Sequence, residues 1–171
     1  MRAARRWIPF ALASFGLATS SHGLAQVRDV ELKAAYIYNF AMFTTWPEGT
    51  PPARTPLLVC ASTDSALWPS LQSLNGKPVN GRPWTVVDLA GARGQHCDIA
   101  VLPPTAERPN PGASGVLVVR DGPGRDRAGR GAAITLVDDD EHVRFDVDTQ
   151  EAAKSGLRFS SRLLRLARNV Q

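Results

Sequence analysis

His96 and Cys97 are adjacent in the sequence and form the first pair of side chains that could do nucleophilic chemistry. A catalytic cysteine needs a base across space, and a neighbour in the sequence does not by itself supply one. The chain has one further cysteine, Cys60, and in an oxidising compartment two cysteines favour a disulfide over a reactive thiol. This pair therefore gives no support for an enzyme.

Other arrangements that could hold a metal ion or a phosphate are equally weak. The acids at 138–141 lack the spacing of an EF-hand loop, and a solvated hairpin turn explains them better than calcium. His142 lies at the same turn, where an exposed structural role is the simpler explanation. Ser114 lacks the GxSxG spacing of a nucleophile elbow, and no glycine-rich stretch has the spacing of a phosphate loop. We predict no catalytic residue, no metal, no cofactor and no enzymatic activity.

One small-molecule pocket can be suggested from polar and aromatic residues in the apolar segment 29–47. Its members are Tyr38, Asn39 and Trp46. A polar side chain in a buried helix most often satisfies a nearby carbonyl, and a tryptophan beside a proline most often packs. A ligand pocket is therefore the second interpretation of these residues.

The elements that would position these residues alternate between helix and strand. Residues 29–47 predict a helix with Asp29 as N-cap and Pro47 as stop, apolar nearly all round and so mostly buried. The apolar runs 57–61 and 116–119 predict strands covered on both faces. Further strands are predicted at 84–88 and 98–102, a short helix from Pro69, and a hairpin from 132–137 and 142–147.

Two closing helices are predicted after the hairpin. Asp148 is the N-cap of the first and Gly156 its left-handed end. The second follows Ser160, with an apolar stripe that reaches Val170. Its opposite side carries Arg162, Arg165 and Arg168, which are candidate partner-binding residues. The fold class is α/β: a single domain with a mixed, largely parallel sheet flanked by helices on both faces.

Residues 1–25 predict a secretory signal peptide, which leaves 26–171 as one domain. Arg2, Arg5 and Arg6 form a basic start, residues 7–18 an apolar core, and Gly23-Leu24-Ala25 a small-x-small cleavage site. The adjacent arginines at 5 and 6 keep a twin-arginine route open as the alternative.

Charge and hydropathy of the remaining chain narrow the class of partner. Without the signal peptide, 17 basic residues face 16 acidic ones, a formal net charge of +1. No basic patch interleaves with aromatic residues, so we expect no nucleic-acid partner. No second apolar segment is long enough to span a bilayer, so we expect no membrane insertion.

The pairing of Cys60 with Cys97 is not settled by the sequence. The oxidising compartment favours a bond. If Cys60 ends one parallel strand and Cys97 begins another, however, they can lie at opposite edges of the sheet, too far apart to bond. A disulfide and two free buried thiols both stay open.

The two ends of the chain resemble the YfiR-like periplasmic proteins. The segment LKAAYIYNFAMFTTWP is similar to the family's opening K-A-x-Y-I-Y-N-F followed by W-P, and RFDVDTQEAAKSGLRFSSRLLRLA to its closing stretch. Four further features lie between these segments in the order that is typical of the family: LLVCAS, the turn around Gly76 and Gly81, Cys97-Asp98, and Gly131.

This resemblance implies a soluble, dimeric periplasmic regulator. Such a protein binds the periplasmic sensor region of an inner-membrane diguanylate cyclase, holds it inactive and lowers cyclic-di-GMP. The resemblance also implies that Cys60 and Cys97 occupy positions of a redox-sensitive disulfide. The alternative is a periplasmic small-molecule-binding or receptor-accessory protein that uses the pocket at Tyr38, Asn39 and Trp46.

Overall fold

The computed structural model describes residues 22–47, 55–92, 95–106, 114–122, 131–139 and 142–171. Most of the predicted signal peptide and the tip of the acidic turn lie outside these residues. Within the described ranges, no helix is both long enough and apolar enough to cross a membrane.

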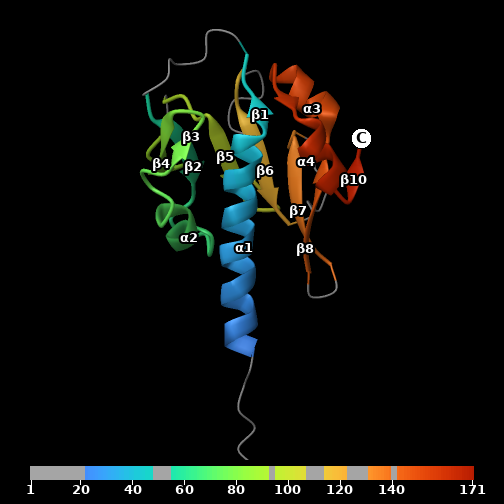
Figure 1. Cartoon of the computed structure of the whole chain (residues 1–171). Coiled ribbons are helices and arrows are strands. Elements are labelled where there is room, and N and C mark those ends of the chain that lie inside the picture. Colours follow the sequence, from blue (N-terminus) through green and yellow to red (C-terminus); the bar gives the residue numbers. More distant parts are fainter. Residues whose placement is uncertain (1–21, 48–54, 93–94, 107–113, 123–130, 140–141) are drawn as a thin grey trace, which may run out of the picture.

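An eight-stranded sheet forms the centre of the molecule (Figure 1). Its strands follow the order β10-β8-β7-β6-β5-β2-β4-β3. Neighbouring strands are parallel except in the pairs β7–β8 and β3–β4. The predicted mixed, largely parallel α/β fold is thus confirmed. The strand bounds are β2 Leu57–Ala61, β3 Pro78–Val79, β4 Arg82–Asp88, β5 Ile99–Leu102, β6 Leu117–Asp121, β7 Ile134–Asp139, β8 His142–Val147 and β10 Asn169–Val170.

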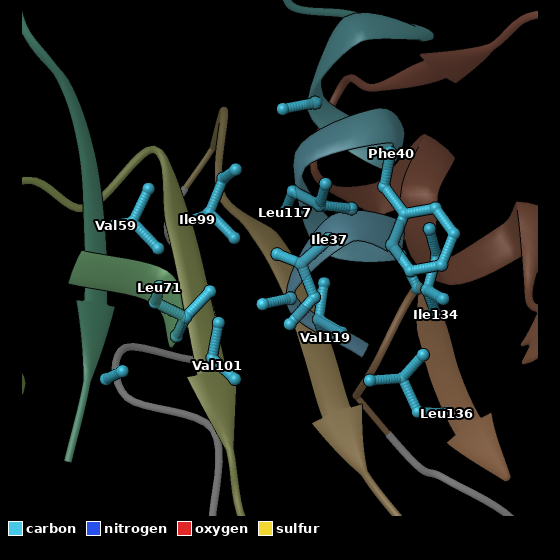
Figure 2. Packing of buried hydrophobic residues seen from close by; sticks show 14 of the residues in the cluster. Ile37, Phe40, Val59, Leu71, Ile99, Val101, Leu117, Val119, Ile134 and Leu136 are labelled. Carbon is cyan, nitrogen blue, oxygen red and sulfur yellow. The ribbon is translucent and has the colours of Figure 1, made fainter. Parts of the chain in front are cut away.

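The main hydrophobic core lies on one face of this sheet. All four helices bury side chains there: α1 (His22–Met42), α2 (Trp68–Gln72), α3 (Thr149–Lys154) and α4 (Ser161–Leu166). Figure 2 shows Ile37 and Phe40 of α1 against Leu117, Val119 and Ile134 of the sheet. Alternate residues of each central strand point into this core, as the pleat of a strand requires.

The opposite face of the sheet carries a second, smaller cluster that no described helix covers. Its buried members are Ala100, Leu102, Val116, Val118 and Ala132, with Leu89 and Ala106 packed against them. In the described part of the chain the helices thus lie against one face only, whereas the prediction placed helices on both faces. Continuous apolar strands indicate that both faces are buried, but loops bury the second face here, and a strand pattern cannot distinguish a loop from a helix as the cover.

Helix α1 differs from the prediction at both ends. It begins at His22, so Asp29 lies inside the helix and is not its N-cap. It ends at Met42, because Thr44–Thr45 (β1) leaves the helix to pair antiparallel with Arg158–Phe159 (β9). One side of α1 is also open to solvent, with Leu32 and Met42 exposed at 43% and 38%. The predicted burial of most of its circumference is correct only for the sides that face the sheet.

The C-terminal segment follows its local signals as far as α4. The Asp148 carboxylate accepts hydrogen bonds from the N–H groups of Gln150 and Glu151, Gly156 has φ +73°, and the Ser160 hydroxyl accepts from the Leu163 N–H. Helix α4 then stops at Leu166, whereas the prediction extended it to Val170. The last residues form β10, which pairs parallel with β8.

Candidate functional site

Two of the three predicted partner-binding arginines lie together on the exposed side of α4. Arg162 and Arg165 are exposed on this helix, and Leu166 beside them leaves 62% of its surface open. Leu163 faces the core instead. We call Arg162, Arg165 and Leu166 the α4 surface; it combines two cations with an apolar side chain, a composition typical of protein interfaces.

Arg162 contacts Phe43, the residue directly after α1. Its guanidinium carbon lies 5.7 Å from the centre of the Phe43 ring, within the range of a cation–π contact. The Ser160 N–H donates to the Phe43 carbonyl oxygen, which fixes the start of α4 at the same place. The α4 surface is therefore attached to the first helix of the domain as well as to the sheet.

Arg168 does not share this helical surface. It lies between α4 and β10, and its Nε and Nη2 atoms donate to the two carboxylate oxygens of Asp146 at 2.9 and 2.7 Å. These hydrogen bonds outweigh the small cost of desolvation and raise the pKa of Arg168 above its usual value. The predicted position of Arg168 on the helix is wrong, because β-sheet pairing replaces the helix after Leu166. Its contact with a partner stays a prediction.

Cys60 and Cys97 form a disulfide, with 5.9 Å between their Cα atoms. The difficulty raised by the sequence disappears because β2 and β5 are neighbours in the sheet, not opposite edges. Cys97 thus carries no free thiol in this state. His96, which precedes Cys97 in the sequence, leaves 48% of its side chain exposed, and its Nε2 atom lies 4.0 Å from Oδ1 of Asp98.

A buried ion pair lies directly beside the disulfide, and sequence reasoning missed it. The Arg82 guanidinium donates to both carboxylate oxygens of Asp98 at 2.9 and 2.7 Å, and to the carbonyl oxygens of Thr55 and Pro56. Asp98 also accepts from the Leu58 N–H. The two charged residues are 16 positions apart, and no sequence spacing marks such a pair.

A second charged cluster, also missed, joins α1 to the sheet. The Lys33 Nζ atom lies 3.0 Å from carboxylate oxygens of both Asp121 and Asp138, at the ends of β6 and β7. Burial lowers the pKa of Lys33, but the hydrogen bonds and negative charges of Asp138 and Asp121 outweigh it and leave this pKa above its usual value. The sequence contains no clear signal for this role, since α1 also carries Arg28, Asp29 and Glu31.

The residues of the predicted ligand pocket have separate surroundings. The Tyr38 hydroxyl donates to the Pro78 carbonyl oxygen at 2.7 Å, and its ring packs against Trp84. Asn39 is exposed on α1. Trp46 is half-buried, and its Nε1 atom is enclosed without a hydrogen-bond partner among the described residues. The pocket stays a prediction, in which Trp46 is the residue with an unused donor.

No group of three or more histidine, cysteine, aspartate or glutamate residues suited to a metal ion occurs in the described part of the chain. No curated protein matches the sequence. A family model described as YfiR/HmsC-like matches residues 30–168, from the third turn of α1 to the residue before β10. The match spans most of the chain and both resembling end segments, so the protein belongs to the YfiR/HmsC-like family.

Proposed function

We propose that this protein is a periplasmic repressor that binds the periplasmic region of an inner-membrane diguanylate cyclase and lowers cyclic-di-GMP. Its family is one of periplasmic regulators of such cyclases, and membership of that family is the observation that carries the proposal. The fold adds a physical reason. Arg162 and Arg165 are exposed, Cys60 is bonded to Cys97, and Tyr38 and Arg168 are bound to their own chain, so among the predicted functional residues the two exposed arginines suit the docking of a partner.

The α4 surface is the contact that we assign to the cyclase. Arg162 is positioned by the Phe43 ring and Leu166 is exposed, so a cation and an apolar side chain are presented together. Residues that combine fixed geometry with apolar area give more binding free energy than mobile surface charges. An isolated exposed ion pair is worth less than about 1 kcal/mol, whereas a cation enclosed at an interface is worth about 2 kcal/mol or more.

Deletion and complementation in the native host test both parts of the proposal. Deletion is expected to raise cellular cyclic-di-GMP, and wild-type protein to restore the low level. The variant Arg162→Glu/Arg165→Glu is expected to restore it poorly. A matched control is Arg144→Glu/Lys77→Glu, which reverses two exposed charges elsewhere and is expected to complement fully. Unchanged cyclic-di-GMP after deletion refutes the repressor, and full complementation by the first variant refutes only the surface.

A homodimer belongs to the same proposal. The open side of α1 exposes Leu32 and Met42, two large apolar residues on a helix whose other sides are packed. Two copies that bury these residues together remove them from water. Sedimentation equilibrium of wild type and of Leu32→Glu is expected to show a dimer and a monomer, respectively. A wild-type protein that is monomeric at micromolar concentration refutes the homodimer.

A small-molecule-binding or receptor-accessory protein is the second candidate. The enclosed Nε1 donor of Trp46 favours it, since a buried donor without a partner is uncommon. Tryptophan fluorescence of wild type and Trp46→Phe in periplasmic extract fractions decides between them. A fraction that shifts only the wild-type emission supports this candidate.

A further inference from the structure

Two asparagine–glycine pairs lie on either side of β3. Asn75 precedes Gly76, and Asn80 precedes Gly81. All four residues are exposed, and both glycines have a positive φ, +82° and +84°. In such a pair the glycine has no Cβ atom that would shield its nitrogen from the side-chain amide of the asparagine. The two pairs have the same local sequence chemistry, so a difference in their reactivity comes from the fold.

The first pair is bound to β4 through both of its reactive groups. The Asn75 Oδ1 atom accepts a hydrogen bond of 2.9 Å from the Val86 N–H. The Gly76 N–H donates a hydrogen bond of 2.9 Å to the Trp84 carbonyl oxygen. The Gly76 nitrogen therefore cannot approach the side-chain amide of Asn75 unless two hydrogen bonds to the sheet break.

The second pair forms the two-residue loop of the β3–β4 hairpin, in which Val79 pairs with Arg82. Neither the Asn80 side chain nor the Gly81 N–H has a hydrogen-bond partner among the described residues. Asn80 also has φ +49°, the one positive value at a described residue other than glycine. A residue with a Cβ atom is strained in this left-handed region, so rotation out of it relieves strain. The fold thus leaves the second pair unprotected.

We propose that Asn80 is a site of spontaneous deamidation in the folded protein. The Gly81 nitrogen attacks the Asn80 Cγ atom, and the new N–Cγ bond closes a cyclic imide. The Cγ–Nδ2 bond breaks, and Nδ2 leaves as ammonia with the proton of the Gly81 N–H. Water then opens the imide. Cleavage of the N–Cγ bond gives an aspartate at position 80, whereas cleavage between the nitrogen and the main-chain carbonyl carbon gives an isoaspartate.

An isoaspartate at position 80 lengthens the main chain of the hairpin loop by one carbon atom. The residues on either side cannot adjust freely, because Val79 is fully buried and Arg82 binds both carboxylate oxygens of Asp98. The modification therefore weakens the pairing of β3 with β4 and loosens the ion pair. The site lies at the β3 edge of the sheet, whereas β10, which follows α4, lies at the other edge. This proposal and the docking of a cyclase can therefore fail independently.

Peptide mapping by mass spectrometry during incubation at mildly alkaline pH tests the site directly. The change from amide to carboxyl group adds mass, and fragmentation assigns this gain to position 75 or position 80. In the folded protein, position 80 is expected to react at least about fivefold faster than position 75, since two hydrogen bonds protect the first pair. In protein unfolded by urea, the two rates are expected to be similar. No gain at position 80, or equal rates at the two positions in the folded protein, overturns the proposal.

Two variants test the consequence for the hairpin. Incubation is expected to lower the melting temperature of wild type and to leave that of Asn80→Gln unchanged, because the longer side chain closes its imide ring far more slowly. Freshly purified Asn80→Asp carries the new charge on a normal main chain and is expected to be more stable than incubated wild type. Labelling by an isoaspartyl methyltransferase measures the isoaspartate. Incubated wild type that contains isoaspartate at position 80 and keeps its melting temperature overturns the effect on the hairpin.

Discussion

The carboxylate of Asp98 is bound by the guanidinium of Arg82 through two hydrogen bonds of 2.9 and 2.7 Å, with both residues almost completely buried. Asp98 directly follows Cys97, and its second contact, the Leu58 N–H, lies two residues before Cys60. The ion pair and the disulfide thus join β2 to the start of β5 at adjacent positions. Arg82 brings β4 into the same group.

Asp98→Asn is expected to lower the free energy of unfolding by about 3–5 kcal/mol, because it leaves the Arg82 charge buried without a counterion. Urea denaturation measures the loss. The paired change Arg82→Met/Asp98→Leu is expected to lose less than the single change, since it removes both charges. The exposed Arg144→Gln serves as control and stays within about 0.5 kcal/mol of wild type. A single change as mild as this control contradicts the role of the pair.

Lys33→Met is expected to destabilise the fold by about 1 kcal/mol at neutral pH, because it removes the bridge to Asp121 and Asp138. The pKa of Lys33 is raised in the folded state above its usual value of 10.5. The stabilisation is therefore complete below pH 10.5 and is lost as pH rises through the folded pKa. Urea denaturation of both proteins from pH 7 upward is expected to show a constant difference that shrinks only above pH 10.5. A difference that already shrinks between pH 7 and 9 contradicts this assignment.

Cys60→Ala/Cys97→Ala is expected to lower the free energy of unfolding by about 2–4 kcal/mol, since the bond closes a loop of 37 residues in the unfolded chain. Mass spectrometry after alkylation under non-reducing conditions checks the bond itself. Two alkylated cysteines in purified protein contradict the disulfide. Equal stability of wild type with and without reductant contradicts only its energetic contribution.

Gly156→Ala is expected to be clearly more destabilising than Gly76→Ala. Both glycines have positive φ, +73° and +82°, so an alanine costs about 1–2 kcal/mol of backbone strain at either position. At Gly76 a new Cβ meets nothing within 4 Å, whereas at Gly156 it lies 3.2 Å from the Pro47 Cβ atom. Overpacking of this kind adds about 1 kcal/mol or more. Thermal denaturation measures both variants. Equal melting temperatures contradict the expected clash, because they show that Pro47 shifts away from the new Cβ atom at no cost.

Export is expected to produce a mature chain that begins at Gln26. The basic start, the short apolar core and Gly23-Leu24-Ala25 motivate this expectation. Intact-mass measurement of the periplasmic fraction checks it. A full-length mass in the membrane fraction contradicts it.

Local signals in the sequence predicted the existence of the helices and strands better than the residues at which they begin and end. Asp148, Gly156 and Ser160 act as predicted because each needs only its own turn of backbone. Asp29 fails as an N-cap because the preceding residues continue the helix to His22. A capping side chain marks a possible start, but the residues before it decide whether the helix extends further.

Pairing between distant parts of the chain determines the end of α4 and the partners of the charged residues at the candidate site, and neither can be predicted from the sequence. Helix α4 ends early because the Arg168 and Gln171 N–H groups donate to the Phe145 and Val147 carbonyl oxygens, and Arg168 binds Asp146. The partners of Lys33 and Arg82 are likewise brought together only by the order of strands. The number and type of charged residues on a strand or helix do not reveal which of them will be buried.

The pairing of β1 with β9 sets a limit on when this protein can fold. Thr44 meets Phe159, and Tyr36 and Phe40 of α1 pack on Phe145, so the first helix makes contacts with the last quarter of the chain. Contacts between distant positions form late, because a large loop must close before they stabilise anything. The domain therefore cannot close until its C-terminal segment has been synthesised. The proposed export as an unfolded polypeptide fits this order of events, because the core stays incomplete for as long as the C-terminal segment is missing.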